Sequence, residues 1–470
     1  MLPSPRQIKF PNGASFALDT LVNLFVDSLS DPTHPSHCAL FYTSTLTKLI
    51  DLPTMQVLTE LRASRHDLLE TCLIFLTTPR SQDEIRTLQN TVETCSCPKD
   101  NSLLNGLHRY CPPLKQRRSL FPEVISDISI MLVSCIINHK EPSKVPMLHN
   151  LQKRTLKEEK RGKTPMWPIA PDAFYTTFGA ETTVKMFWQW AYMYKRLPSF
   201  TLLNAIVILA GTTLSIMIFA MPSFAPELIE ITNKIADSLE KIKFVADRDF
   251  TILKGVENTA YLMTSEMIAR GEGRRVEAYW QDHKEALLQA LSRVVSVTSG
   301  TRFHGDLVQR TCLIHDILYV PLDAAKYHPF IIEGSRALCK EHEKENDFWM
   351  AYRLILQVTI SDRCHSPGCL ETFTNAGRKF QFCSGCLRVP YCSKKCQVRA
   401  WKLDKAPHKI ICPLVREFSD RTRLPYKFSD EPPLAPDVAK KMCQEKGVDE
   451  EKARAIHLYF RMLDTLMVDA

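Results

Sequence analysis

The stretch CSGCLRVPYCSKKC, residues 383–396, places four cysteines within fourteen positions. A further pair of candidate ligands lies on each side of it. Short gaps of two or three residues within such pairs let a turn direct both side chains at one tetrahedral metal ion. Seven thiolates and one imidazole match two closed zinc sites, which are structural because catalytic zinc keeps an open position. The eight candidate ligands are Cys364, Cys369, Cys383, Cys386, Cys392, Cys396, His408 and Cys412.

The composition is that of an ordinary globular protein. Of the 470 residues, 45% are hydrophobic and 24% charged, and the net charge is only +8. The first residues, MLPSPRQIKFPNGASF, lack the charged start and apolar run of a signal peptide. We therefore expect the cytosol or nucleus, where clustered cysteines indicate metal ligands. Nine of the sixteen cysteines are scattered and are interpreted as core or surface thiols: Cys38, Cys72, Cys95, Cys97, Cys111, Cys135, Cys312, Cys339 and Cys443.

Residues 1–360 are predicted to form a helical body. Apolar residues recur at helical spacing, and alternating strand patterns are scarce. The body is either an irregular helical domain or an armadillo- or solenoid-like stack of helix pairs, although no fixed repeat period is visible. Two segments show the helical period, one with Leu18, Leu21, Val22, Phe25, Val26 and Leu29, the other with Trp280, Leu287, Leu291 and Val294.

Two smaller regions are predicted after this body. Residues 361–414 contain the zinc ligands, and 415–470 hold a connector and a C-terminal amphipathic helix. The connector, 416–438, is rich in proline and mixed charge. We expect the helix to pack against the rest of the chain, because an isolated helix of this length is marginal in water. Asp449 is its predicted cap, and its apolar face consists of Ile456, Tyr459, Phe460 and Leu463.

An uncharged run at residues 202–221, LLNAIVILAGTTLSIMIFAM, has two interpretations. It is long enough to span a bilayer, and Lys195 and Arg196 precede it as interfacial cations. Several polar residues dilute the run, however, and Gly211 can divide it into two short helices. We favour two buried helices of the core, because a central helix is apolar all round. A single-span membrane protein displaying a cytosolic finger is the alternative.

The cysteine-rich segment resembles the MYND zinc finger family over residues 364–412. The resemblance rests on CSGC, on YCSKKCQ four residues later, and on the following W and HKIIC. It implies two structural zinc ions held by interleaved pairs of ligands. One ion would bind Cys364, Cys369, Cys392 and Cys396, and the other Cys383, Cys386, His408 and Cys412.

Three features depart from the family pattern. Four residues separate Cys364 from Cys369 where two are usual, so the neighbouring His365 is an alternative ligand. The spacing from Cys396 to His408 is also longer than usual, which makes His408 the least certain ligand. Ala400 stands where an acidic residue is common.

Family resemblance implies that the finger docks peptides of the form Pro-x-Leu-x-Pro in partner proteins, often transcriptional corepressors. Gln397 and Trp401 would line the groove, because a tryptophan face suits a pre-extended proline segment. The alternative is that Trp401 belongs to the finger's core. We predict an adaptor or regulatory protein, with transcriptional regulation as one setting.

The chain itself contains the peptide pattern in PPLAP, residues 432–436. Pro432, Leu434 and Pro436 occupy the three specified positions. A flexible connector of nineteen residues reaches about 24 Å, which is enough to fold back on a small module. Self-docking, within one chain or between two copies, is therefore a hypothesis.

Nucleic-acid binding is not expected, because the finger's nine basic residues largely offset its own thiolates. An enzyme is not expected either. The SET-type lysine methyltransferases that carry this finger have most of their catalytic domain after it, whereas only 58 residues follow Cys412. No phosphate loop, HExxH helix or glycine-framed nucleophilic serine is present.

Overall fold

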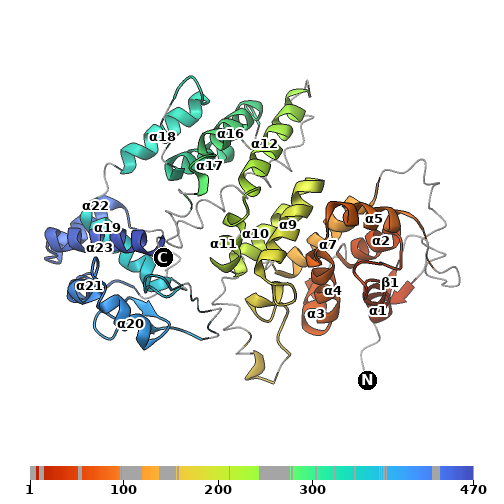
Figure 1. Ribbon diagram of the computed structural model, residues 1–470, viewed down its shortest axis with the longest axis horizontal. Coiled ribbons are helices and arrows are strands. Elements are labelled where there is room, and N and C mark those ends of the chain that lie inside the picture. The colour runs from red at the N-terminus through yellow and green to blue at the C-terminus, as the bar shows by residue number, and fades with distance from the viewer. Residues whose placement is uncertain are drawn as a thin grey trace. The chain divides into compact units, whose positions relative to one another are not determined.

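The computed structural model describes residues 7–9, 15–50, 55–97, 119–136, 155–242, 276–425 and 434–468, apart from short gaps within these ranges. The chain forms two compact units, and both are mainly helical (Figure 1). The first comprises residues 1–231 with 249–259, and the second 232–248 with 260–470. The predicted boundaries at residues 360 and 414 stay a prediction.

The first unit begins with an antiparallel pair of short strands, in which Ile8 lies opposite Phe16. The other elements of its described part are helices, and Leu18, Leu21, Val22 and Phe25 are buried in α1 as their spacing predicts. The elements are β1 (Gln7–Lys9), β2 (Ser15–Ala17), α1 (Leu18–Ser28), α2 (Ala39–Ile50), α3 (Met55–Ser64), α4 (His66–Thr77), α5 (Gln82–Glu93), α7 (Phe121–Ile136), the 3-10 helix η2 (Pro171–Phe174), α9 (Ala180–Tyr194), α10 (Leu197–Ala210) and α11 (Thr212–Phe219).

The core of the first unit is built around α10. This helix packs against α7 and α9, and Leu203, Ile206 and Leu209 are completely buried in it (Figure 1). The uncharged run 202–221 thus belongs to two helices, α10 and α11, on either side of residue 211. The predicted division into two short core helices is confirmed. Among the described helices, none has the length and apolar character needed to cross a membrane.

The described elements of the second unit are helices and one small cysteine-rich hairpin. Helix α12 (Phe224–Glu240) passes from one unit to the other, and its C-terminal part pairs with Arg293 of α16 through Asp237 at 2.6 Å and Glu240 at 3.0 Å. The other elements are α16 (Lys284–Val297), α17 (His304–Leu318), α18 (Pro329–His342), α19 (Asp347–Ile360), β3 (Gln381–Phe382), β4 (Pro390–Tyr391), α20 (Lys394–Trp401), α21 (His408–Thr422), α22 (Pro436–Glu445) and α23 (Glu450–Val468).

Helix α23 confirms the predicted C-terminal amphipathic helix. Asp449 caps it by accepting a hydrogen bond from the backbone of Lys452 at 3.0 Å. The helix packs against α19 and α21. Its predicted apolar face is buried: Ile456, Tyr459, Phe460 and Leu463 are at most 8% exposed.

Two local predictions need correction. Residues 416–422, assigned to the connector, continue α21, because Phe418, Ser419 and Thr422 are buried on its inner face. Trp280 is buried as expected, but it precedes α16, which begins at Lys284 after a turn.

Candidate metal centre

Four cysteines, which come as two pairs from separate segments, form the first cluster, and their sulfur atoms all lie within 4.8 Å of one another. Its members are Cys364, Cys369, Cys392 and Cys396. The four residues between Cys364 and Cys369 form a turn in which the Cys369 N–H donates to the Ser366 carbonyl at 3.0 Å. Gly368 has φ 69° in this turn, a left-handed conformation that favours glycine. Ser393 caps α20 by accepting from the Cys396 N–H at 3.2 Å, which fixes the last pair.

The second cluster is held between the hairpin and the start of α21. Its members are Cys383, Cys386, His408 and Cys412, whose ligand atoms also lie within 4.8 Å of one another. The turn between β3 and β4 is closed by two hydrogen bonds, from the Cys383 N–H to the Val389 carbonyl and from the Leu387 N–H to the Cys383 carbonyl. His408 and Cys412 are four residues apart in α21, so they share one face of the helix.

The spacing of the ligand atoms fits two tetrahedral zinc ions. With Zn–S bonds of about 2.3 Å, neighbouring sulfurs of a tetrahedral site lie about 3.8 Å apart. Disulfide sulfurs would be bonded at about 2.05 Å, and all seven cysteines are free. The observed separations are 3.6 Å for Cys369–Cys392, 3.4 Å for Cys392–Cys396, 3.7 Å for Cys383–Cys412 and 3.5 Å from Cys386 Sγ to His408 Nε2. Each cluster supplies four protein ligands, so both zinc sites are closed and structural.

The negative charge of the first cluster's thiolates is not balanced by the side chains around it. Burial raises the pKa of the Cys364 thiol and raises that of Cys369 to about 11, because desolvation disfavours the thiolate. The Arg399 guanidinium donates to the Cys396 sulfur at 3.5 Å and to the Ser366 hydroxyl at 2.9 Å. One fixed positive charge cannot balance four thiolates, three of which are buried. A zinc ion supplies the missing charge and crosslinks the segments that carry them.

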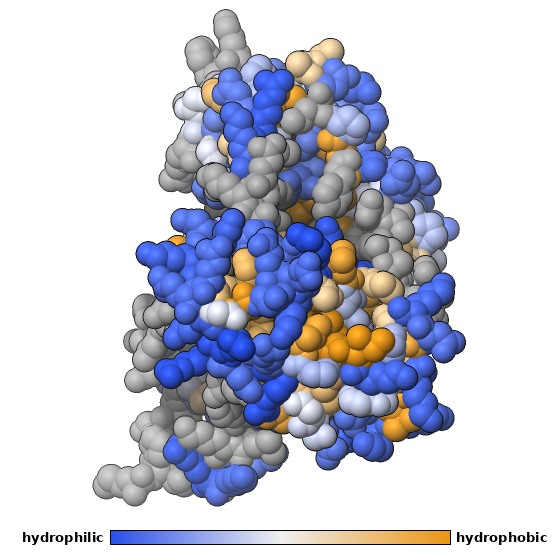
Figure 2. Space-filling model, turned by 90° about the vertical axis from the view of Figure 1, so that its left-hand side faces the viewer, coloured by the Kyte–Doolittle hydropathy of each residue, from blue (hydrophilic) through white to orange (hydrophobic). Residues whose placement is uncertain are grey.

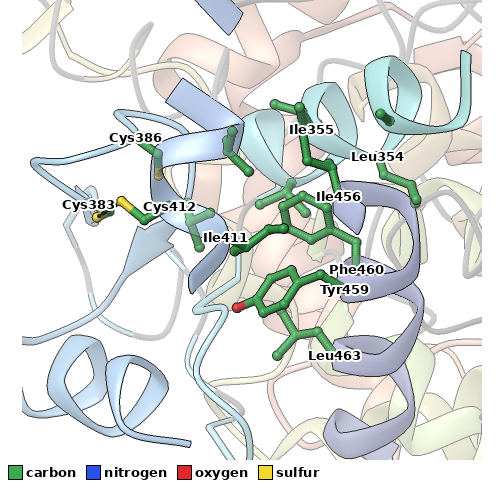
Figure 3. Packing of buried hydrophobic residues seen from close by; sticks show 14 of the residues in the cluster. Leu354, Ile355, Cys383, Cys386, Ile411, Cys412, Ile456, Tyr459, Phe460 and Leu463 are labelled. Carbon is green, nitrogen blue, oxygen red and sulfur yellow. Dashed lines mark hydrogen bonds between the residues drawn. The ribbon is translucent and has the colours of Figure 1, made fainter. Parts of the chain in front are cut away.

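Helix α23 supports the second cluster from outside. His408 directs Nε2 at the cysteines, and its other ring nitrogen, Nδ1, lies 3.5 Å from the Tyr459 hydroxyl. Such outer partners orient a ligating histidine. Figure 3 shows the rings of Tyr459 and Phe460 on α23 directed toward Ile411, beside the cysteine side chains. One hydrophobic core thus joins the finger to α19, α21 and α23.

The two ligand spacings that differ from the family pattern, Cys364 to Cys369 and Cys396 to His408, leave these residues in their clusters. His365 is buried, but it is not a member of the four-cysteine cluster. Its backbone N–H donates to the Pro390 carbonyl at 3.0 Å. The additional residues before His408 form the turn between α20 and α21, so the ligand still reaches its cluster.

Replacement of Gly385 by alanine is expected to weaken zinc binding at the second cluster. A Cβ atom at this position would lie only 2.6 Å from the Cys412 sulfur, which cannot move away while it binds zinc. We expect about a 10- to 100-fold loss of affinity, as when the surroundings of metal ligands are altered. Competition with a chromogenic chelator measures it. Gly305→Ala is the matched control because nothing lies within 4 Å of its added Cβ; identical competition curves for the two variants would contradict the prediction.

The two predicted peptide-binding residues lie together on α20. Gln397 and Trp401 are four residues apart, beside the buried stripe of Cys396 and Ala400. Trp401 is 38% exposed, and its ring meets that of His408 edge-on with centroids 5.9 Å apart. Trp401 therefore packs on a zinc ligand and also offers part of its ring to solvent.

The finger concentrates exposed apolar side chains. Figure 2 shows one side of the molecule, where hydrophilic side chains cover most of the described surface. Among the described residues, ten large hydrophobic side chains are exposed, and five of them lie within residues 364–412. The five are Phe382, Leu387, Val398, Trp401 and Ile410. Val398 was not among the residues predicted from the sequence, although its place three residues before Trp401 puts it on the same side of the helix.

The described part of the PPLAP segment contacts α19. The Leu434 carbonyl accepts a hydrogen bond from the Trp349 indole at 2.8 Å, and the Pro436 carbonyl accepts one from the Asn346 amide at 3.0 Å. Pro432 lies outside the described residues. These contacts fix the end of the segment where α22 begins.

Comparison with known proteins identifies the cysteine-rich segment. Residues 364–412 match the family described as the MYND finger, a zinc-binding protein-interaction module. The rest of the chain is not assigned to a family. No curated protein and no solved structure matched the chain.

Proposed function

Since residues 364–412 form a MYND finger, we propose that the chain is an adaptor or regulatory protein whose finger docks proline-containing segments of partner proteins. The exposed apolar side chains of Val398 and Trp401, three residues apart on the same side of α20, carry this proposal, because exposed apolar patches mark protein interaction sites. Transcriptional regulation is the setting that the family resemblance suggests.

The chemistry of α20 supports a proline-containing ligand. The exposed part of the Trp401 ring gives a flat apolar face, which suits proline rings in an extended segment. Such a segment is already ordered before binding, so it loses little entropy on docking. The Gln397 side chain, one helical turn away, can donate to and accept from the peptide backbone.

Trp401→Ala is expected to weaken peptide binding by at least about 30-fold, because a central aromatic anchor contributes about 2 kcal/mol or more. The measurement is fluorescence anisotropy of a labelled Pro-x-Leu-x-Pro peptide titrated with the zinc-loaded full chain. Val438→Ala removes an exposed apolar side chain from α22 and is the matched control.

Zinc content is measured alongside, because Trp401 also contacts the ligand His408. If the Trp401→Ala variant keeps its zinc but loses peptide binding, the result supports the surface of α20 as the peptide-binding site. A wild-type chain that does not bind the peptide, or a Trp401→Ala variant that binds as the wild type does, overturns the proposal.

We also propose that the chain is not an enzyme and that it acts in the cytosol or nucleus. The SET-type methyltransferase alternative makes a distinct prediction, namely binding of S-adenosylmethionine. Isothermal titration of the zinc-loaded chain with this cofactor tests it, and measurable binding would favour the enzyme.

A further inference from the structure

Three cysteines of the first unit, interpreted from the sequence as scattered thiols, lie together in the structure. The sulfur atoms of Cys38, Cys95 and Cys97 are all within 4.8 Å of one another. Cys38 immediately precedes α2, and its carbonyl accepts from the N–H groups of Phe41 and Tyr42 in the first turn. Cys95 and Cys97 follow α5, just after its last helical turn. The cluster is thus assembled from two helix ends that are distant in sequence.

The backbone favours negative charge at this cluster. The Cys38 N–H donates to the Cys97 sulfur at 3.2 Å. This sulfur therefore lies at the N-terminus of α2, a twelve-residue helix, where the backbone hydrogen bond favours a thiolate. The side-chain hydrogen bond with Cys38 and burial nevertheless raise the pKa of the Cys97 thiol, so a bound cation is needed to hold it as a thiolate. A hydrogen bond from backbone to sulfur is also the support that metal-bound thiolates receive from their surroundings.

The loop that carries Cys38 is held in place on both sides. The Tyr42 hydroxyl donates to the Ser28 carbonyl at 3.1 Å and accepts from the His37 N–H at 3.4 Å. Arg80 donates to the Pro32 carbonyl at 2.6 Å in the same loop. A preorganised ligand needs little reorganisation when it binds a metal ion.

We propose that Cys38, Cys95 and Cys97 form a third zinc site, separate from the finger. Three thiolates supply three corners of a tetrahedron, and no fourth Cys, His, Asp or Glu of the described residues joins them; the fourth position in this proposal takes an exchangeable ligand from solvent. The opening lies at Cys95, which is exposed, whereas Cys38 and Cys97 are 3% and 8% exposed. Sites closed by four protein ligands hold zinc structurally, while an open position permits exchange. The third ion therefore exchanges faster than the two ions of the finger.

The test counts zinc on the full chain in the presence of a phosphine reductant. The protein is equilibrated with buffered free Zn²⁺ and separated from unbound metal. The bound zinc is then measured by inductively coupled plasma mass spectrometry. We expect about three ions per wild-type chain and about two for Cys95→Ser/Cys97→Ser. Because Cys95 is exposed, Cys95→Ser alone tests the site without disturbing the core, and its third ion should bind at least about tenfold more weakly.

Cys72→Ala is the matched control, since it removes a buried cysteine of α4 outside the cluster and should keep about three ions. Two ions on the wild-type chain, or three on the double variant, overturn the proposal. A disulfide among these cysteines that persists in the reductant, with two ions bound, also overturns it in favour of a redox role.

Discussion

Removal of zinc from the full chain is expected to unfold residues 346–468 while the first unit stays folded. His408 and Cys412 occupy the first turns of α21, and Ile411 and Val415 between and after them pack into the core shared with α23. Without the ion, neither the hairpin nor the start of α21 is fixed. A structural zinc site contributes about 10–16 kcal/mol in zinc-finger peptides. This contribution is comparable to the whole stability of a domain, about 5–15 kcal/mol.

Hydrogen exchange read by mass spectrometry provides the measurement. After chelation, amides of α21 and α23 should exchange rapidly, whereas those of α10, in the core of the first unit, should stay protected. Restoration of protection by added Zn²⁺ shows that the change is reversible. If α23 keeps its protection in the chelated protein, the hydrophobic core is sufficient alone and the prediction is wrong.

Phe460→Ala is expected to lower the free energy of unfolding of the zinc-loaded second unit by about 3–5 kcal/mol. The side chain is 2% exposed, and its ring lies 5.2 Å from that of Tyr459 in the core between α23 and the finger. Truncation of such a buried ring loses its transfer free energy and leaves a cavity. Denaturant unfolding, followed by hydrogen exchange of the α23 amides read by mass spectrometry, measures the change.

Leu458→Ala is the control on the same helix. This leucine is 55% exposed, two residues from Phe460 on the outer face of α23. Its replacement should change the free energy of unfolding by no more than about 0.5 kcal/mol. Equal losses in the two variants would show that α23 does not dock through the face described.

The zinc ligands could be predicted from sequence because metal binding constrains the chain locally. A tetrahedral ion requires pairs of ligands at short spacing, and such pairs are visible in the order of the cysteines. The long segment before His408 did not disturb the site because it forms a turn between two helices. Helices α1 and α23 were equally predictable, since a single buried face leaves a period of 3.6 residues in the sequence.

Features that depend on tertiary packing were not visible. Cys38 and Cys97 are 59 residues apart, and nothing in either segment indicates the other. Residues 416–422 were assigned to the connector because of their charges and the prolines that follow, although Phe418 is buried against the core. Of the exposed apolar side chains of the finger, Trp401 was expected from the family resemblance, and the others could be found only from the burial of each residue.

The hydrogen bonds at the start of α19 oppose self-association through the PPLAP segment, because they must break before the segment can bind elsewhere. Asn346 accepts from the Trp349 N–H at 3.1 Å as the helix cap, and its amide also donates to the Pro436 carbonyl. For the PPLAP segment to enter the groove of a second copy, it must release this bond and that from the Trp349 indole to Leu434. At about 1 kcal/mol for each bond, the competition weakens dimerisation by about 30-fold. A free peptide from another protein would meet no such opposition, so under the proposed function this contact favours the binding of partners over self-association.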